Sequence, residues 1–334
     1  MTSPLRWGLI GASWIAEDWV LPALRESGAE AVAVSSRDLG RARGYAARNR
    51  IAAAYGSFHG LLANPAVEAV YVSSTNELHH PQVIAAAAAG KHVLCEKPIA
   101  RTLEEGREMV DACAGAGVVL AVDHHMRNGP TLRAMRRLLV EGAIGAPLAI
   151  RIHHAILLPP FLQTWRTTSP DAGGGAILDL TTHDADTIRF LTGDEVAEVT
   201  AFAATQRFGG PGVEDALMGV MRMRSGVLVS FHDAYTIAGS PTAVEIHGTE
   251  GSLIGNEVLR QAPEGGVSIR RGDQLEPVDV GERTDLYRYG IEAFTAAVRG
   301  HGRPLVSGED GLRSLAVALA VAESARTGCS VRVA

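Results

Sequence analysis

Cysteine is scarce in this chain, and long hydrophobic runs are absent. The 334 residues include three cysteines, Cys95, Cys113 and Cys329. They form neither an even set for disulfides nor a metal-ligand spacing, so we interpret them as buried small hydrophobes in a reducing compartment. The longest apolar stretches, such as residues 83–89 and 315–322, fall far short of the ~20 residues that cross a bilayer. We therefore expect no disulfide framework and no membrane span.

We also expect no targeting segment, and the sequence contains no basic run. The chain passes from Met1 directly into a strand-like stretch at residues 7–10, which leaves no room for a signal peptide and favours a cytoplasmic protein. The 31 basic residues are scattered among 37 acidic ones, giving a formal charge of -6 without aromatic interleaving, which argues against a nucleic-acid partner. With 46% apolar and 20% charged residues, the chain is expected to fold throughout. Its length allows two domains.

The first part of the chain alternates short apolar runs with helical segments. This alternation predicts a doubly wound α/β domain, a Rossmann-type parallel sheet over residues 1–123. Helix signals support it: Pro81 and Gly90 bracket an alanine-rich helix, and Thr102 with Glu105 forms a capping box. The expected strands cover residues 7–11, 31–36, 69–74, 92–96 and 118–122.

The sequence pattern changes after residue 123, and we predict a second domain over residues 124–334. Turns at residues 224–226 and 248–251 separate strand-like runs, which favours a large, mostly antiparallel open sheet. The fold class is therefore α/β in both parts. The expected strands cover residues 147–152, 216–223, 227–231 and 244–247, and the expected helices cover residues 131–141, 287–299 and 309–327.

Lys97 follows the apolar strand 92–96 and precedes Pro98. In open parallel sheets, ligands bind beyond the carboxyl ends of the strands, where strand order reverses. Lys97 has that kind of position, so it is a candidate functional residue. The alternative is a solvated lysine in a loop between a strand and a helix.

The first strand leads into a loop close to the Gly-x-Gly-x-x-Gly/Ala dinucleotide motif. Gly11 and Ala16 fit that motif, whereas Ser13 replaces the middle glycine. About 20 residues later, where an acidic residue would meet the ribose of NAD, the chain instead has Ser36, Arg37 and Arg41. Serine and arginine suit a 2'-phosphate, which predicts NADP. The alternative is that both arginines lie on a solvated helix face.

A glycine run at residues 173–175 leads into a predicted helix that carries Asp179 and His183. Residues four apart share one helical face, so the carboxylate can orient the imidazole for proton transfer. An ordinary surface pair is the alternative, and we interpret Asp186 as structural. Adjacent histidines at 79–80, 124–125 and 153–154 would point to opposite faces of a strand, and no cysteine-histidine spacing for zinc occurs, so we expect no metal.

These motifs together resemble the Gfo/Idh/MocA oxidoreductases over nearly the whole chain. The resemblance rests on the Gly11 loop, Ser73-Ser74-Thr75-Asn76 with His79, the run from Gly90 to Glu96-Lys97-Pro98, the glycine run before Asp179 and His183, and the turn at 248–251. It implies a Rossmann domain followed by an α/β domain with a large, mostly antiparallel sheet, and it implies Lys97, Asp179 and His183 as the catalytic set. Within the family the chain looks closest to NADPH-dependent reductases of a sugar ketone.

The resemblance also implies binding residues. Those expected at NADPH are Gly11, Ala12, Ser13, Trp14, Ile15, Ala16, Ser36, Arg37, Arg41, Ser74, Thr75, Asn76, His79, Glu96, Lys97, Trp165 and Arg166. Those expected at the sugar are Lys97, His124, Arg127, His154, Asp179 and His183.

Two other functions stay open on the sequence. One is an NAD(P)-dependent dehydrogenase of an inositol or another cyclic polyol. The other is a non-catalytic NADP-binding regulatory protein, although such a protein would not need the proton-transfer groups Lys97, Asp179 and His183. We expect either a monomer or a homo-oligomer that forms through the sheet of the second domain.

Overall fold

A computed structural model describes residues 3–334 and divides them into two compact units. The first unit runs to His124 and also takes in residues Tyr287–Leu312. The second contains residues His125–Leu286 and Arg313–Ala334. Each unit combines a sheet with helices, so the predicted α/β class is confirmed.

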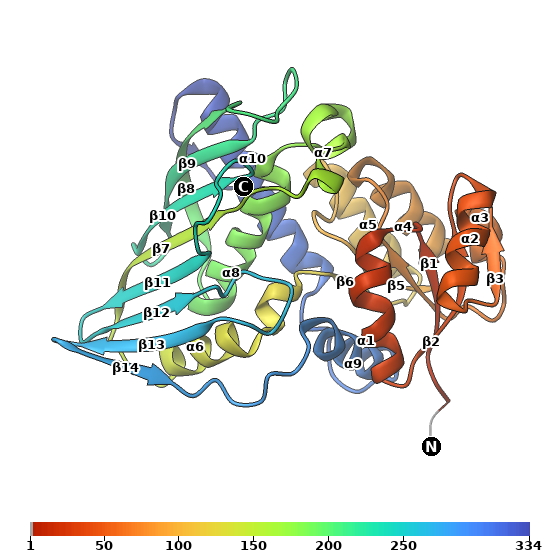
Figure 1. Ribbon diagram of the computed structural model, residues 1–334, viewed down its shortest axis with the longest axis horizontal. Helices are drawn as coiled ribbons and strands as arrows, with labels where there is room; N and C mark the ends of the chain where they lie inside the picture. The colour runs from red at the N-terminus through yellow and green to blue at the C-terminus, as the bar shows by residue number, and fades with distance from the viewer. Residues whose placement is uncertain (1–2) are drawn as a thin grey trace. The chain divides into compact units, whose positions relative to one another are not determined.

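The sheet of the first unit contains six parallel strands in the order β3-β2-β1-β4-β5-β6 (Figure 1). Strand order reverses at β1, whose neighbours are β2 on one side and β4 on the other, and this reversal marks the binding edge of such sheets. The strands are β1 (Arg6–Ile10), β2 (Glu30–Ser35), β3 (Ala53–Tyr55), β4 (Ala69–Val72), β5 (His92–Cys95) and β6 (Leu120–Val122).

Helices connect these strands, and two of the predicted helix ends are confirmed. Thr102 caps α5 by accepting a hydrogen bond from the Glu105 amide at 3.1 Å, and Gly90 ends the region of α4 with a φ of 67°. The helical segments are η1 (Ala16–Val20, a π-helical turn), α1 (Leu21–Glu26), α2 (Leu39–Asn49), α3 (Phe58–Leu62), η2 (Asn76–Leu78), α4 (His79–Ala88), α5 (Leu103–Gly115) and α9 (Leu286–Val298).

Two sequence-based predictions for this part need correction. Strand β3 was not predicted, because its three half-buried residues are too few to show an alternating pattern. The prediction also assigned all of residues 124–334 to one domain, whereas Tyr287–Leu312 belong to the first unit. The cause is packing: the ring of Phe294 lies 5.0 Å from the buried Trp7, and the ring of Tyr287 stacks on Trp19 at 5.8 Å.

The second unit holds a sheet of nine strands in the order β14-β13-β12-β11-β7-β10-β9-β8-β15 (Figure 1). Neighbouring strands are antiparallel except β7 and β10, which run parallel and place His154 beside Asp233. The strands are β7 (Pro147–Ala155), β8 (Val196–Ala204), β9 (Ala216–Met223), β10 (Leu228–Ala234), β11 (Ala243–Gly248), β12 (Ser252–Asn256), β13 (Gly266–Arg271), β14 (Gln274–Val278) and β15 (Val331–Arg332).

Helices α6 and α8 lie along one face of this sheet (Figure 1). Ile150, Ile152 and Phe231 point from the strands toward that face and are buried with Leu180 and Ile188. The helix predicted over residues 309–327 is α10 (Gly308–Thr327), and the short strand β15, which was not predicted, follows it and pairs with β8. The helical segments are η3 (His125–Asn128), α6 (Pro130–Val140), η4 (Pro160–Leu162), α7 (Trp165–Thr168), η5 (Pro170–Ala172), η6 (Ile177–Thr181, a π-helical turn), α8 (Thr182–Thr192) and α10 (Gly308–Thr327), whose first residues belong to the first unit.

None of the helices within residues 3–334 is both long and apolar enough to cross a membrane.

Candidate active site

The predicted site residues divide between the two units. The first unit holds the residues around Gly11, Ser36, Ser74 and Lys97, together with His124, at loops that follow strands of the parallel sheet. The second unit holds Arg127, His154, Trp165, Arg166, Asp179 and His183.

The loop after β1 depends on glycine at position 11. Gly11 has a φ of +110°, and a Cβ there would lie 3.1 Å from both the carbonyl carbon and the oxygen of Ser73. Only glycine meets both conditions without strain. Helical structure begins shortly afterwards with the π-helical turn η1, so the backbone amides of residues 12–16 lie at a helix start, where an anion is favoured.

Ser13 replaces the middle glycine of the motif without blocking the loop. Its hydroxyl lies 2.8 Å from the hydroxyl of Ser73 and accepts a hydrogen bond from the Ala16 amide at 3.2 Å. The side chain therefore bonds to the protein's own loops on both sides. This geometry accounts for a serine where glycine is usual.

The first turn of α2, which follows β2, presents one basic side chain to the same loop. The Arg41 guanidinium donates to the carbonyl oxygen of Ala12 at 2.8 Å, which holds it beside the glycine loop. Asp38 caps α2 by accepting from the Arg41 amide at 3.1 Å, and the Ser36 hydroxyl accepts from the Asp38 amide at 3.3 Å. Arg37 is exposed. A dinucleotide fits this group of residues, because the close approach at Gly11 suits a pyrophosphate and the arginines suit further phosphate.

Lys97 is half-buried in a loop that is fixed from two sides. On one side the Glu96 carboxylate accepts from the Tyr71 hydroxyl at 2.5 Å and from the Lys97 amide at 3.2 Å. On the other side the ring of His79 lies 2.8 Å from the carbonyl oxygen of Pro98. Burial, aided by the Glu96 charge, raises the pKa of Tyr71 well above its usual value, so the phenol stays a donor to that carboxylate.

His79 also ties this loop to the end of β4. Its second ring nitrogen lies 3.3 Å from the carbonyl oxygen of Ser74, and the whole ring is buried. Desolvation lowers the pKa of His79 although both carbonyl contacts act in the opposite direction. The neighbouring Ser74 hydroxyl donates to Gln82 at 2.7 Å, and the Thr75 hydroxyl donates to Glu77 at 2.6 Å. The residues predicted at this edge therefore form one braced set of loops.

In the second unit, the glycine run allows the chain to pass close to its own backbone. A Cβ at Gly174 would lie 2.6 Å from the carbonyl oxygen of Trp165, and one at Gly175, whose φ is +115°, would lie 2.2 Å from a carboxylate oxygen of Glu214. Larger residues at these two positions would push apart the segment that leads to Asp179. The glycine run therefore fixes the position of the backbone that leads to Asp179.

The sequence predicted one α-helix that carries both Asp179 and His183. Asp179 lies instead in the π-helical turn η6, and His183 lies in α8. The wider turn alters the four-residue spacing on which that prediction relied. The Asp179 carboxylate accepts from the Tyr235 hydroxyl at 2.7 Å and lies 3.7 Å from Nε of Arg166. Arg166 in turn stacks over the ring of Trp165, with its guanidinium carbon 4.6 Å from the ring centroid.

His183 lies in the first turn of α8, among other buried histidines. Its ring lies 5.2 Å from that of His125 and 6.1 Å from that of His154, measured between centroids, and all three side chains are almost fully buried. Nδ1 of His154 lies 2.9 Å from the Asp184 carboxylate. Three imidazoles in one buried place give this unit a capacity to bind polar groups and to move a proton.

Several residues of this site were not predicted. Three of them contact a predicted residue: Tyr71 donates to Glu96, Tyr235 donates to Asp179, and Asp184 contacts His154. Asp233 is the strand neighbour of His154 and accepts a hydrogen bond from Thr181. Their positions depend on strand register and loop packing, which local sequence patterns do not encode.

Arg127 and Asp186 form a buried, bidentate ion pair. The Nε atom of Arg127 lies 2.8 Å from one Asp186 oxygen, and a terminal nitrogen contacts the other. The structural role predicted for Asp186 agrees with this geometry. Arg127, predicted at the sugar, is engaged in the same pair, and His124 is buried at the end of the segment after β6.

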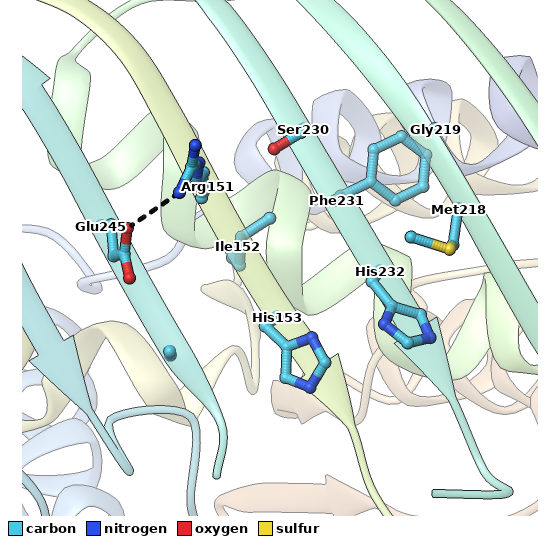
Figure 2. A pocket seen from close by; sticks show the side chains of 10 residues that line it. Arg151, Ile152, His153, Met218, Gly219, Ser230, Phe231, His232 and Glu245 are labelled. Atoms are coloured by element: carbon cyan, nitrogen blue, oxygen red, sulfur yellow. Dashed lines mark ion pairs between the residues drawn. The ribbon is translucent and has the colours of Figure 1, made fainter. Parts of the chain in front are cut away.

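A hollow of about 290 Å³ lies on the sheet of the second unit, and it is not this site. Figure 2 shows His153 and His232 on neighbouring strands in that hollow, with Arg151 paired to Glu245 at 3.8 Å. Side chains alternate along a strand, so His153 points away from the face that buries His154. The hollow and the buried histidines therefore belong to opposite faces of the sheet. Within residues 3–334, no group of three or more histidine, cysteine, aspartate or glutamate side chains is placed to hold a metal ion.

Two family descriptions match the chain. "Oxidoreductase family, NAD-binding Rossmann fold" matches residues 5–124, and "GFO/IDH/MocA C-terminal domain" matches residues 132–254. The two matches fall largely in the first and second units, respectively.

The chain is also similar to named proteins over nearly its full length. It is 50% identical to 1,5-anhydro-D-fructose reductase of Ensifer adhaerens, covering 98% of each chain. It is 31% identical to D-xylose 1-dehydrogenase (NADP(+)) 2 of Haloferax volcanii, covering 98% of this chain and 100% of the other. Among solved structures, levoglucosan dehydrogenase in complex with NADH and levoglucosan superimposes with a TM-score of 0.88 at 26% identity, covering 99% of both chains.

Proposed function

Because the chain belongs to the Gfo/Idh/MocA family of oxidoreductases, we propose that it reduces a sugar ketone with NADPH, converting 1,5-anhydro-D-fructose to 1,5-anhydro-D-mannitol. The observation that carries this proposal is the 50% identity, over 98% of each chain, to a protein named for reduction of that ketose. The braced Lys97 loop and the buried histidines supply chemistry suited to it.

We assign the dinucleotide to the loops at the reversal of strand order in the first unit. Residues Gly11–Ala16 would lie against the pyrophosphate, and Ser36, Arg37 and Arg41 would meet the 2'-phosphate of NADPH. The support is that Arg41 is already held at the Ala12 carbonyl, while the carboxylate of Asp38 is engaged at the start of α2. Bound in its reduced form, the nicotinamide supplies the hydride.

The protein's own groups handle the carbonyl oxygen. The Lys97 ammonium binds and polarises that oxygen by a charge-assisted hydrogen bond, which stabilises the negative charge that develops as the carbon is reduced. His183, with Asp179 as its carboxylate partner in the proposal, supplies the proton that completes the alcohol. In the oxidative direction His183 would accept the same proton.

Other polar side chains would bind the sugar. His124, Arg127 and His154 offer donors and acceptors suited to hydroxyl groups, and Trp165 with Arg166 would lie at the cofactor. The Glu96 carboxylate would act mainly by holding the Lys97 loop, as its bonds to Tyr71 and to the Lys97 amide suggest.

The test is an assay of NADPH oxidation over anhydroketoses, osones, ketoses and inososes, with NADH measured in parallel. We expect turnover of 1,5-anhydro-D-fructose to exceed that of the other compounds, and NADPH to be preferred. Turnover confined to inososes would identify a polyol dehydrogenase instead. Tight NADPH binding without turnover of any compound would favour a regulatory protein.

The oligomeric state and the location in the cell remain predictions. The face of the second sheet that carries His153 and His232 also exposes Phe202, Met218 and Val220, so a second copy could bind there. Sedimentation of the purified protein would distinguish a monomer from a homo-oligomer.

A further inference from the structure

Two aspartates are fully buried in the second unit and take no part in the proposed reaction. Asp184 lies in α8, directly after His183, and Asp233 lies in β10. Both have 0% exposure. Two acids in such a place would repel each other strongly if both were ionised.

One oxygen of each carboxyl group contacts a polar atom of another residue. An Asp184 oxygen lies 2.9 Å from Nδ1 of His154, and an Asp233 oxygen accepts from the Thr181 hydroxyl at 2.5 Å. The parallel register of β7 and β10 makes Asp233 the direct neighbour of His154. The group therefore links β7, β10 and the start of α8.

The two remaining oxygens, Oδ2 of Asp184 and Oδ1 of Asp233, are buried and accept from no donor among residues 3–334. Each carboxyl group shifts the pKa of the other, so the two lie near enough to interact. Ionised carboxylates only accept hydrogen bonds, so a hydrogen bond between the two needs a proton on one of them. One proton shared by these oxygens would satisfy both.

We propose that Asp184 and Asp233 share one proton in the folded protein and act as positioning residues that hold His154 with its Nδ1–H toward Asp184. With Nδ1 as the donor, a neutral His154 has Nε2 as its acceptor. A fixed tautomer gives the ring one defined polar edge. The consequence for sugar binding rests on the proposed function, whereas the shared proton does not.

Burial supports the shared proton. It raises the pKa of Asp184 to about 7, although the interaction with Asp233 lowers that pKa in part. It also raises the pKa of Asp233 well above the usual range, and the charge of Asp184 adds to that increase. The groups that face the pair are His154 from β7 and Thr181 from the turn before α8, with His183 next in sequence. Asp186, further along α8, is already paired with Arg127.

The pair predicts a loss of stability in alkaline solution. A carboxyl whose pKa is higher in the folded than in the unfolded protein stabilises the fold at low pH, and that stabilisation disappears as the pH rises through the folded value. Asp233→Asn replaces the shared proton by an amide that donates permanently to Asp184, while its oxygen still accepts from Thr181. This variant should therefore be less sensitive to alkali than the original protein.

The experiment compares the urea midpoint of unfolding at about pH 6 and about pH 9. We expect the midpoint of the original protein to fall over this range, and that of Asp233→Asn to fall by less than about half as much. The exposed Asp273→Asn is the matched control and should follow the original protein. Equal falls for the original protein and Asp233→Asn would overturn the shared proton.

A second readout follows the tautomer of His154. In nitrogen-15 spectra at neutral pH, we expect His154, assigned by its loss in His154→Gln, to carry its proton on Nδ1. Asp184→Asn keeps an oxygen acceptor and should keep that signal. The apolar Asp184→Leu removes the acceptor. If Asp184→Leu does not fold, the nitrogen-15 measurement is still made on Asp184→Asn. A proton on Nε2 of His154 in the original protein would refute the positioning role.

Turnover measurements test the role in sugar binding, which rests on the proposed function, separately from the shared proton. Asp184→Leu should raise KM for the sugar ketone by at least about tenfold and leave NADPH binding unchanged, because the sugar loses a positioned partner. An unchanged KM in a folded variant would contradict the role in sugar binding. If the original protein turned over no ketone, the proposed function would fail, while the urea and nitrogen-15 results would still decide the shared proton.

Discussion

Lys91 and Lys97 are the two lysines of the chain, and their surroundings differ. The Lys91 ammonium donates to the main-chain carbonyl of Val67 at 2.7 Å, so it closes a loop of the protein itself. Lys97 instead stands in a loop whose neighbours on both sides, Glu96 and Pro98, are held by Tyr71 and His79. The structure thus provides a functional candidate and a natural control of the same residue type.

Replacing Lys97 by alanine should lower kcat for ketone reduction by about 10²- to 10⁴-fold, the range typical for loss of one acid-base or electrostatic group. NADPH binding should change little, because the phosphate-facing residues are untouched. Lys91→Ala should leave kcat close to that of the original protein. Stopped-flow turnover and cofactor fluorescence measure these quantities, and unchanged turnover of a folded Lys97→Ala protein would remove Lys97 from the mechanism.

The choice between the two cofactors is expected to depend on the residue after β2. Ser36→Asp introduces a carboxylate that repels a 2'-phosphate and can accept a hydrogen bond from a ribose hydroxyl. We expect the preference for NADPH over NADH to fall by about 10- to 100-fold, the range for one charge-assisted hydrogen bond. The exposed Arg43→Ala on α2 serves as the control and should leave the preference unchanged. An undiminished preference in Ser36→Asp would place the 2'-phosphate elsewhere.

At the scale of elements, the loop that joins β8 to β9 is organised by a single carboxylate. Asp215 accepts hydrogen bonds from the backbone amides of residues 206, 207, 208 and 209, at distances of 2.6 to 3.0 Å. Burial alone would raise the pKa of Asp215, but these amides lower it overall. The ionised form therefore stabilises the loop.

Asp215→Asn should lower the free energy of unfolding by roughly 2 to 4 kcal/mol at neutral pH, because hydrogen bonds to a charged acceptor are lost or weakened. A carboxyl with a depressed folded pKa stabilises the protein above its unfolded pKa and loses that contribution as the pH falls through the folded value. The difference between the variant and the original protein should therefore shrink in acid. Urea unfolding at neutral and acidic pH measures it, and a difference that did not depend on pH would contradict this role.

The elements show which features the sequence could predict. Strands β1, β2, β4, β5 and β9 were predicted to within about two residues, because buried strands bounded by turns leave a clear pattern. The π-helical turn that carries Asp179 was not, since its apolar residues are spaced as in an α-helix. The contact between His154 and Asp184 joins residues 30 positions apart, and it depends on how α8 packs against the sheet.

At the scale of the whole molecule, two ordinary layer architectures carry the function. The glycine loop, the basic end of β2 and the lysine loop all lie in the first unit, and the buried histidines and aspartates lie in the second. The sequence shows these motifs separately because each of them is local. It did not predict the return of Tyr287–Leu312 to the first unit, which rests on long-range aromatic packing against Trp7 and Trp19.

The most direct test of the central proposal is transfer of deuterium from NADPH that is deuterated at the hydride-donating face of the nicotinamide C4. With 1,5-anhydro-D-fructose as substrate, we expect 1,5-anhydro-D-mannitol with one deuterium on the former carbonyl carbon, formed in step with NADPH consumption. The reaction should be strongly slowed in Lys97→Ala and not in Lys91→Ala. A product without deuterium, or no product while NADPH binds tightly, would contradict a ketone reductase.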